Sequence, residues 1–305
     1  MNVTDSVFYA VRFPVLVASG LLSSFTVFVV VYLLVKKPSL CQDGKVFFLI
    51  VLVLFRYLNC FINLITVTVT FWFSGISQLL CSVYLLFEYF IVFMEYNCLS
   101  AMCVDRYVAI CSPFHYQSLC CFQNILKILF GLTVLSCGMP LAGFIYWTYS
   151  ISASEDGGSF LWCQGHSLNH ALSFKIPWIT LLGLWFSFSI VVIGFCYIMV
   201  YKEGKKAGVI IPSNKRATKT IVFQVLQLSL SFFPLLVSLV LFQLPEWRLM
   251  KWSTYSVIEA VNFIVSTLAQ TICPVIYGLR SRSIRDIVKR LFCSWKLRTK
   301  LHPAS

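Results

Sequence analysis

Seven long apolar runs dominate the chain, and short polar stretches separate them. The runs cover residues 14–35, 46–73, 79–104, 128–154, 176–201, 220–245 and 252–279. Each is long enough for a helix across a ~30 Å hydrocarbon core, which needs about 20 residues. Strands of a membrane barrel would be about 10 residues long and would alternate polar and apolar positions. The pattern therefore predicts an all-α membrane protein that is a seven-transmembrane helix bundle.

The same pattern predicts a single domain over residues 1–305, because no repeat or soluble domain interrupts the runs. We expect an extracellular segment over 1–13, the bundle over 14–279 and a cytoplasmic tail over 280–305. The first run is too long for the apolar part of a cleavable signal peptide, so we expect it to be retained. Apolar residues recur at helical spacing from Ile284 to Trp295, between basic residues. This stripe indicates a short amphipathic cytoplasmic helix in the membrane interface after helix seven.

Composition and charge set the surroundings and the orientation. The chain is 59% hydrophobic and 11% charged, whereas a soluble domain carries about 25% charged residues. Most Lys and Arg residues follow the first, third and fifth runs or lie in the tail. Because basic loops stay in the cytoplasm, we expect a multi-pass plasma-membrane protein with an extracellular N-terminus. Asn2 opens a glycosylation sequence on that outer side.

The net charge of the chain also indicates which partners it binds. The net charge of +13 is spread over several short segments. It therefore indicates membrane topology and a lipid bilayer as partner, and it does not favour nucleic acid.

A fifteen-residue stretch at the end of the third run identifies a family resemblance. "MCVDRYVAICSPFHY", residues 102–116, closely resembles the end of helix three in class A (rhodopsin-like) G protein-coupled receptors, in its odorant-receptor form. "PVIYGLRSRSIRD" at 274–286 resembles the end of their helix seven, and "NKRATKT" at 214–220 resembles their third cytoplasmic loop. The last two look closest to fish-type odorant receptors. The resemblance implies an odorant-type receptor that binds a small molecule in the bundle and activates a heterotrimeric G protein, without a cofactor.

The resemblance also implies roles for single residues. It assigns G-protein coupling to Asp105, Arg106, Tyr107 and Tyr277. Arg106 would pair with Asp105 at rest and meet the G protein when helix six moves outward. The alternative is that Arg106 is an arginine at the membrane edge that only extends its charged group to the water interface. The same resemblance implies a disulfide between Cys81 and Cys163 on the extracellular side.

Charges inside the membrane form a second group of candidates. Glu88, Glu95 and Arg106 are seven and eleven residues apart, so they share one face of a helix, which should point into the bundle. Arg56 stands where nearly all related receptors carry an aspartate that, with the facing level of helix three, surrounds a sodium ion. We expect an Arg56–Glu95 ion pair in place of that ion. The alternative is that Arg56 reaches water or lipid headgroups alone.

A ligand pocket is implied at the level of Glu88, where class A ligands bind. An acid there suggests a cationic odorant, and the alternatives are a structural partner such as Lys175 or a protonated carboxyl. The remaining candidates for the pocket come from helices three, six and seven: Tyr89, Val92, Leu236, Leu239, Asn262 and Ser266.

Other function classes receive less support. No phosphate loop, H-E-x-x-H motif or nucleophile elbow is present in the sequence, so we do not expect an enzyme. His166 and His170 are spaced for a metal but are expected to be surface histidines, and no metal site is predicted. A transporter or channel would explain the intramembrane charges, although no paired halves are visible. A non-signalling ligand sink stays open because Arg56 and Cys273 depart from the family pattern.

Overall fold

The computed structural model describes residues 3–36, 44–73, 76–153, 159–160 and 172–206, together with short pieces at 229–230, 232–234, 236–237, 240, 257–258 and 260–269. The described part of the chain is almost entirely helical. Its helices up to residue 206 are α1 (Val3–Lys36), α2 (Gly44–Phe73), α3 (Gln78–Cys111), α4 (Pro113–Leu119), α5 (Phe122–Ala153) and α6 (Leu172–Lys206).

Five of these helices are long and apolar enough to cross a membrane. The apolar spans run over Phe13–Tyr32, Val46–Val69, Leu79–Cys111, Phe122–Tyr149 and Thr180–Lys206, and they correspond to the first five predicted runs. A helical membrane bundle is therefore confirmed. Most of the sixth and seventh runs and the whole tail lie outside the described residues. The described part of the seventh run includes a shorter apolar helix, Ala260–Ala269. The number seven and the amphipathic tail helix stay predictions.

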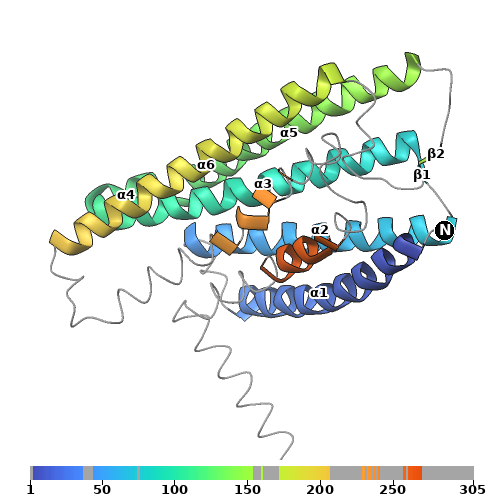
Figure 1. Cartoon of the computed structure of the whole chain (residues 1–305). Coiled ribbons are helices and arrows are strands. Elements are labelled where there is room, and N and C mark those ends of the chain that lie inside the picture. The colour runs from blue at the N-terminus through green and yellow to red at the C-terminus, as the bar shows by residue number, and fades with distance from the viewer. Residues whose placement is uncertain are drawn as a thin grey trace, which may run out of the picture.

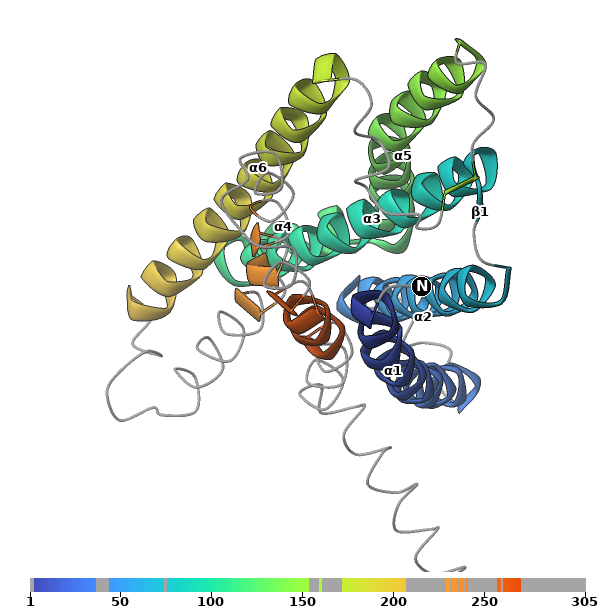
Figure 2. The same ribbon diagram turned by 45° about the vertical axis from the view of Figure 1, so that its right-hand side comes forward.

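Helix α3 is the centre of the described bundle. It packs against α2, α5 and α6, while α1 packs against α2 (Figures 1 and 2). It is also the most buried of the five spans. Its side chains Phe93, Met94 and Leu99 lie in one core with Leu52 of α2 and Phe186 of α6. This central position explains why the polar residues of α3 are surrounded by protein.

Helix α3 extends beyond the predicted end at residue 104. Its backbone ladder continues to Cys111, and the Ser112 N–H still donates to the Val108 carbonyl at 2.9 Å. The hydropathy of the run ends earlier because Asp105 and Arg106 interrupt it. The helix continues since backbone hydrogen bonds do not depend on side-chain polarity.

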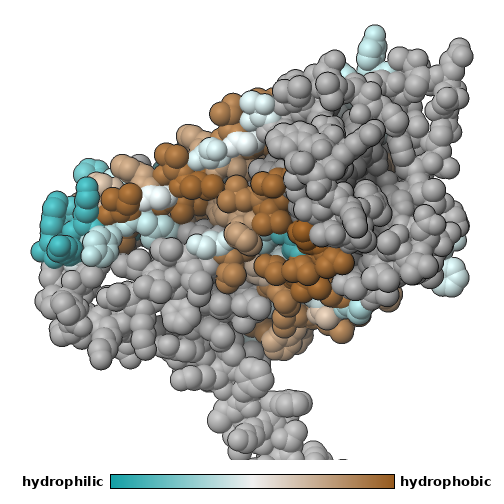
Figure 3. Space-filling model, viewed as in Figure 1, coloured by the Kyte–Doolittle hydropathy of each residue, from teal (hydrophilic) through white to brown (hydrophobic). Residues whose placement is uncertain are grey.

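The outer surface of the helices is rich in exposed apolar side chains. Phe25, Phe130, Phe188 and Val191 are each more than half exposed, and Figure 3 shows apolar side chains over much of the described surface. In a soluble protein so large an apolar surface would promote association. Here it is the surface that a bilayer covers.

A short strand pair departs from the all-helical prediction. Strands β1 (Ile76–Ser77) and β2 (Ser159–Phe160) pair antiparallel, with Ile76 opposite Phe160. Two-residue strands carry no periodic sequence signal, so the prediction missed them. The pairing joins the segment after α5 to the start of α3, where the Ser77 hydroxyl accepts from the Leu80 N–H at 3.3 Å.

Candidate functional site

The end of α3 folds back on itself through α4. One residue, Ser112, separates the two helices, and Pro113 begins α4 at a position where its missing N–H costs nothing. This corner brings Tyr116 over the last turns of α3, where its hydroxyl donates to Asp105 Oδ1 at 3.1 Å. Asp105 is only 5% exposed. The acid of the motif is thus fixed by a tyrosine of the same motif.

The neighbours of Asp105 complete this corner. Arg106 is half-buried, and the Tyr107 ring lies 5.9 Å from the Phe195 ring of α6 between centroids. Burial raises the pKa of the Cys120 thiol, and the nearby Asp105 carboxylate raises it further. The thiol therefore stays protonated at neutral pH. Tyr277 lies outside the described residues.

A second polar site lies deeper in the bundle, between α2 and α3. Arg56 Nε is 3.1 Å from Glu95 Oε1, and the two side chains are 5% and 1% exposed. The contact is an ion pair rather than an aligned hydrogen bond, and Arg56 Nη1 is buried without an acceptor among the described residues. The structure thus brings together two of the charges that the sequence places inside the membrane.

The family assignment rests on comparison with known proteins. The family model for the 7 transmembrane receptor (rhodopsin family) matches residues 21–277. The chain belongs to this family. Members are receptors rather than enzymes, so the prediction that the chain is not an enzyme is confirmed.

Several individual relatives to which the chain is similar are odorant or olfactory receptors. Odorant receptor 131-2 of Danio rerio is 24% identical over 201 residues, which cover 63% of this chain and 58% of the relative. The chain therefore spans less than two thirds of that receptor. Olfactory receptor 2AP1 of Homo sapiens is 25% identical over 255 residues, 77% of this chain and 76% of the relative. Olfactory receptor 51T1 of Homo sapiens is 25% identical over 247 residues, 75% of this chain and 70% of the relative. The predicted resemblance to odorant receptors, including a fish receptor, is confirmed.

The described candidate ligand residues of this rhodopsin-family receptor lie on α3 and on the later pieces of the chain. Glu88 is half-buried on α3, and Tyr89 and Val92 pack against the core. On the later pieces, Asn262 Nδ2 donates to the Pro234 carbonyl at 3.0 Å and so joins the sixth and seventh runs. Leu236 is 46% exposed.

The remaining candidates are less well defined by the structure. Ser266 is partly buried, and Leu239 lies outside the described residues. The ligand pocket formed by the seven predicted residues stays a prediction.

The start of α3 contains a residue of the predicted disulfide. Cys81 is disulfide-bonded and fully buried at the start of α3. Its predicted partner Cys163 lies outside the described residues, as does the glycosylation candidate Asn2. The pairing of Cys81 with Cys163 stays a prediction.

Sequence reasoning missed several polar contacts that join the helices. Asn63 Nδ2 donates to Asn59 Oδ1 at 2.7 Å, and the Tyr84 hydroxyl of α3 donates to Asn63 Oδ1 at 3.0 Å. Asn97 Nδ2 of α3 donates to the Ser136 hydroxyl of α5 at 2.8 Å. Such residues carry no local signal, because only the packed helices show which polar positions face each other.

Proposed function

We propose that this chain is an odorant-type receptor that binds a small molecule within the bundle and activates a heterotrimeric G protein at the end carrying Asp105 and Arg106. The observation that carries the proposal is the partly buried Tyr116–Asp105 hydrogen bond beside half-buried Arg106. It lies within the stretch that resembles the coupling motif of class A receptors. Membership of the rhodopsin family supports the same assignment. The receptor is proposed to lie in the plasma membrane with its C-terminus in the cytoplasm.

In this proposal, Asp105 is the fixed acid that holds the resting arrangement of the corner. A hydrogen bond to a carboxylate is stronger than one between neutral groups, so Tyr116 keeps Asp105 in place beside Arg106. A ligand drives activation only as far as it binds the active arrangement better than the resting one. Arg106 then contacts the G protein.

The Arg56–Glu95 pair is proposed to replace the sodium ion of related receptors. A fixed guanidinium now occupies the neighbourhood of the helix-three acid, at 3.1 Å. Charges buried inside a membrane bundle are expensive alone and therefore pair. The pair would join α2 to α3 permanently, whereas a bound ion exchanges with solution. We therefore expect ligand responses that do not depend on sodium concentration.

Glu88 is proposed to recognise a cationic odorant. It is half-buried on α3, two turns from Glu95 toward Cys81. An acid at the ligand level would stabilise a protonated amine, as opposite charges do at short range.

The decisive experiment tests signalling in transfected cells expressing the full chain. G-protein dissociation is followed across several Gα classes while a panel of amines and neutral odorants is applied. We expect activation by a subset of amines, loss of activation in Arg106→Ala at equal surface level, and weaker amine responses in Glu88→Gln. Responses of Glu88→Gln that match the unmodified chain would remove the cationic-ligand assignment.

Two results would replace the proposed function altogether. Ion flux without G-protein activation would favour a channel. Ligand binding with no activation of any Gα class would favour a ligand sink.

A further inference from the structure

The last turns of α6 carry a cluster of lysines. Lys202, Lys205 and Lys206 are all exposed, and Figure 3 shows hydrophilic side chains at this end of the helix. An open pocket of about 750 Å³ lies here, a volume within the range of small-molecule sites, about 300–1,000 Å³. No acidic residue is among the described residues that line it, which are Tyr197, Ile198, Tyr201, Lys202, Lys205 and Lys206.

The three lysines repel one another. Lys202 precedes Lys205 by three residues and Lys206 by four, and side chains at these spacings are neighbours on a helix. Like charges so placed destabilise the helix. Lys206 Nζ is paired with Glu203 Oε1 at 2.7 Å, whereas Lys202 and Lys205 have no acid partner among the described residues. Two ammonium groups of one pocket therefore lack a counter-charge within the described part of the chain.

The lysines continue the side of α6 that a bilayer covers. An apolar side chain is more than half exposed at every third or fourth position along the helix, and these side chains form a lipid-facing stripe: Leu184, Phe188, Val191, Phe195 and Ile198. Lys202 follows Ile198 by four residues and Lys205 by seven, so both stand on the side of the stripe. Lys202 is about 6 Å beyond Ile198 along the helix axis.

This order of groups matches a lipid better than a soluble anion. Acyl chains that lie against Phe195 and Ile198 place their headgroup at the level of Lys202 and Lys205. A free phosphate compound would use the lysines but would leave the apolar half of the pocket, at Ile198 and Tyr201, without contacts. The arrangement therefore favours an anionic phospholipid.

The number of lysines narrows the headgroup further. Lysine binds phosphate as a point charge. Phosphatidylserine offers a single net negative charge, which one lysine balances. A phosphate monoester carries about −1.5 to −2 charges at neutral pH, so a headgroup with monoesters engages several lysines at once. Basic pockets at the cytoplasmic ends of membrane helices suit such headgroups.

We propose that the end of α6 binds a phospholipid whose inositol headgroup carries phosphate monoesters. The ammonium groups of Lys202 and Lys205 contact phosphate, the Tyr201 hydroxyl donates to a phosphate oxygen, and the acyl chains lie along the lipid-facing stripe. The inference rests on the proposed function, because it requires the end of α6 to lie at the cytoplasmic leaflet, where anionic inositol lipids are found.

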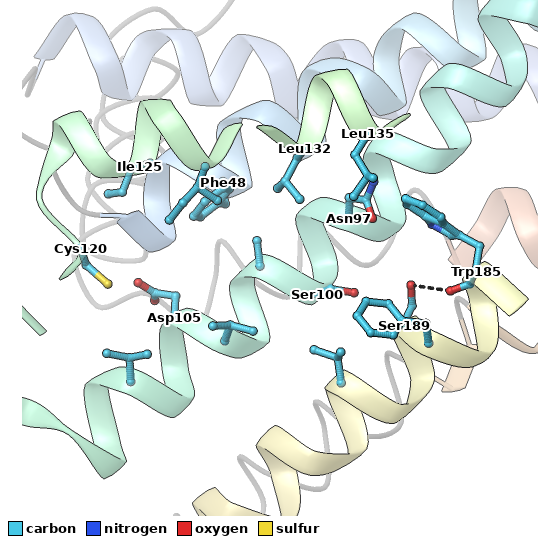
Figure 4. A pocket seen from close by; sticks show the side chains of 16 residues that line it. Phe48, Asn97, Ser100, Asp105, Cys120, Ile125, Leu132, Leu135, Trp185 and Ser189 are labelled. Atoms are coloured by element: carbon cyan, nitrogen blue, oxygen red, sulfur yellow. Dashed lines mark hydrogen bonds between the residues drawn. The ribbon is translucent and has the colours of Figure 1, made fainter. Parts of the chain in front are cut away.

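The site lies beside the corner that is proposed to couple to the G protein. The Phe195 ring of the stripe is 5.9 Å from the Tyr107 ring of α3 between centroids. A cavity of about 810 Å³ between α3, α5 and α6 reaches from Asp105 at one end to Trp185 at the other (Figure 4). Close packing resists movement, and α6 lacks it where it borders this cavity. A lipid held by Lys202 and Lys205 therefore restrains the end of α6 next to Tyr107.

The test measures lipid binding to the full chain purified in detergent, with bound lipids counted by native mass spectrometry. Phosphatidylinositol bisphosphate is compared with phosphatidylserine of the same acyl chains. We expect the bisphosphate to bind at least about five-fold more tightly, the effect of one further basic residue near an anionic group. Soluble inositol trisphosphate should compete only weakly, because it has no acyl chains to cover the stripe.

Substitutions locate the headgroup. Lys202→Gln and Lys205→Gln should each weaken bisphosphate binding about five-fold. Glu203→Gln should tighten it, because the carboxylate that pairs with Lys206 is removed. Lys127→Gln is the matched control, since Lys127 is an exposed lysine of α5 that does not line the pocket. Binding to this variant should equal binding to the unmodified chain.

Several outcomes would overturn the proposal. Equal binding of the two lipids means general attraction to anionic membranes, and equal effects of Lys127→Gln and Lys202→Gln mean the same. Full competition by inositol trisphosphate makes the ligand a soluble anion. If the lysine variants lose G-protein activation while lipid binding is unchanged, the pocket contacts a protein instead.

Lipid binding and signalling are measured separately, so the two proposals can fail independently. A chain that binds the bisphosphate selectively but activates no G protein would refute the proposed function and leave this site standing. A signalling receptor without selective binding would overturn this inference alone.

Discussion

The buried Arg56–Glu95 pair allows the sharpest prediction on stability. Arg56→Met leaves Glu95, whose side chain is 1% exposed, without its counter-charge. Glu95→Met does the same to Arg56, whose side chain is 5% exposed. Removing one partner of a buried pair costs about 3–5 kcal/mol, because the other charge stays desolvated. Methionine is the replacement of choice since it is flexible and fills irregular space.

The double variant separates pairing from simple loss of packing. With both charges gone, no uncompensated charge remains, and hydrophobic replacement of a buried pair is often neutral or stabilising. We expect each single variant to lower the thermal midpoint in detergent by roughly 6–20 °C. The double variant should regain most of that loss. Surface levels in cells should follow the same order.

A surface ion pair of the same receptor is the matched control. Lys206 Nζ lies 2.7 Å from Glu203 Oε1, but the two side chains are 73% and 36% exposed. Glu203→Gln should leave the midpoint and surface level unchanged, because exposed pairs contribute little. A double Arg56→Met, Glu95→Met variant no more stable than the worse single variant would refute the pairing argument.

Three further predictions concern other contacts. Tyr116→Phe removes the hydrogen bond to Asp105 and should raise ligand-independent G-protein activation at equal surface level; an unchanged basal signal would count against a restraining role. Asn97→Ala should lower the thermal midpoint, because a buried polar partner on Ser136 is left unsatisfied at a cost of about 1–3 kcal/mol; adding Ser136→Ala should restore part of it, and a further loss would contradict this reading. Cys81→Ala should lower the surface level through loss of a disulfide that contributes about 2–5 kcal/mol, and mild reductant should lower the midpoint of the unmodified receptor but leave that of the variant unchanged.

The sequence predicted the membrane helices well because hydropathy is a local property. The runs that contain Leu52 and Phe93 are predominantly apolar, and a helix is the simplest structure that satisfies their backbone in lipid. The end of α3 was harder to predict. Asp105 marks the end of the apolar run but not of the helix, which continues to Cys111.

Contacts within the candidate site could be predicted only where the sequence itself indicates that two distant residues need each other. The closeness of Arg56 and Glu95 followed from a charge that needs a partner and from the family arrangement of helices two and three. The contact between Asn97 and Ser136 had no such guide.

The single-residue connection between α3 and α4 has a consequence for how this receptor can vary. Most loops accept insertions, because a change in loop length leaves the helices or strands that the loop joins in place. Here one added residue would shift Tyr116 by one position relative to the start of α4, where successive side chains are about 100° apart. Tyr116 would then face away from Asp105, so chain length at Ser112 is fixed by the tyrosine four residues later.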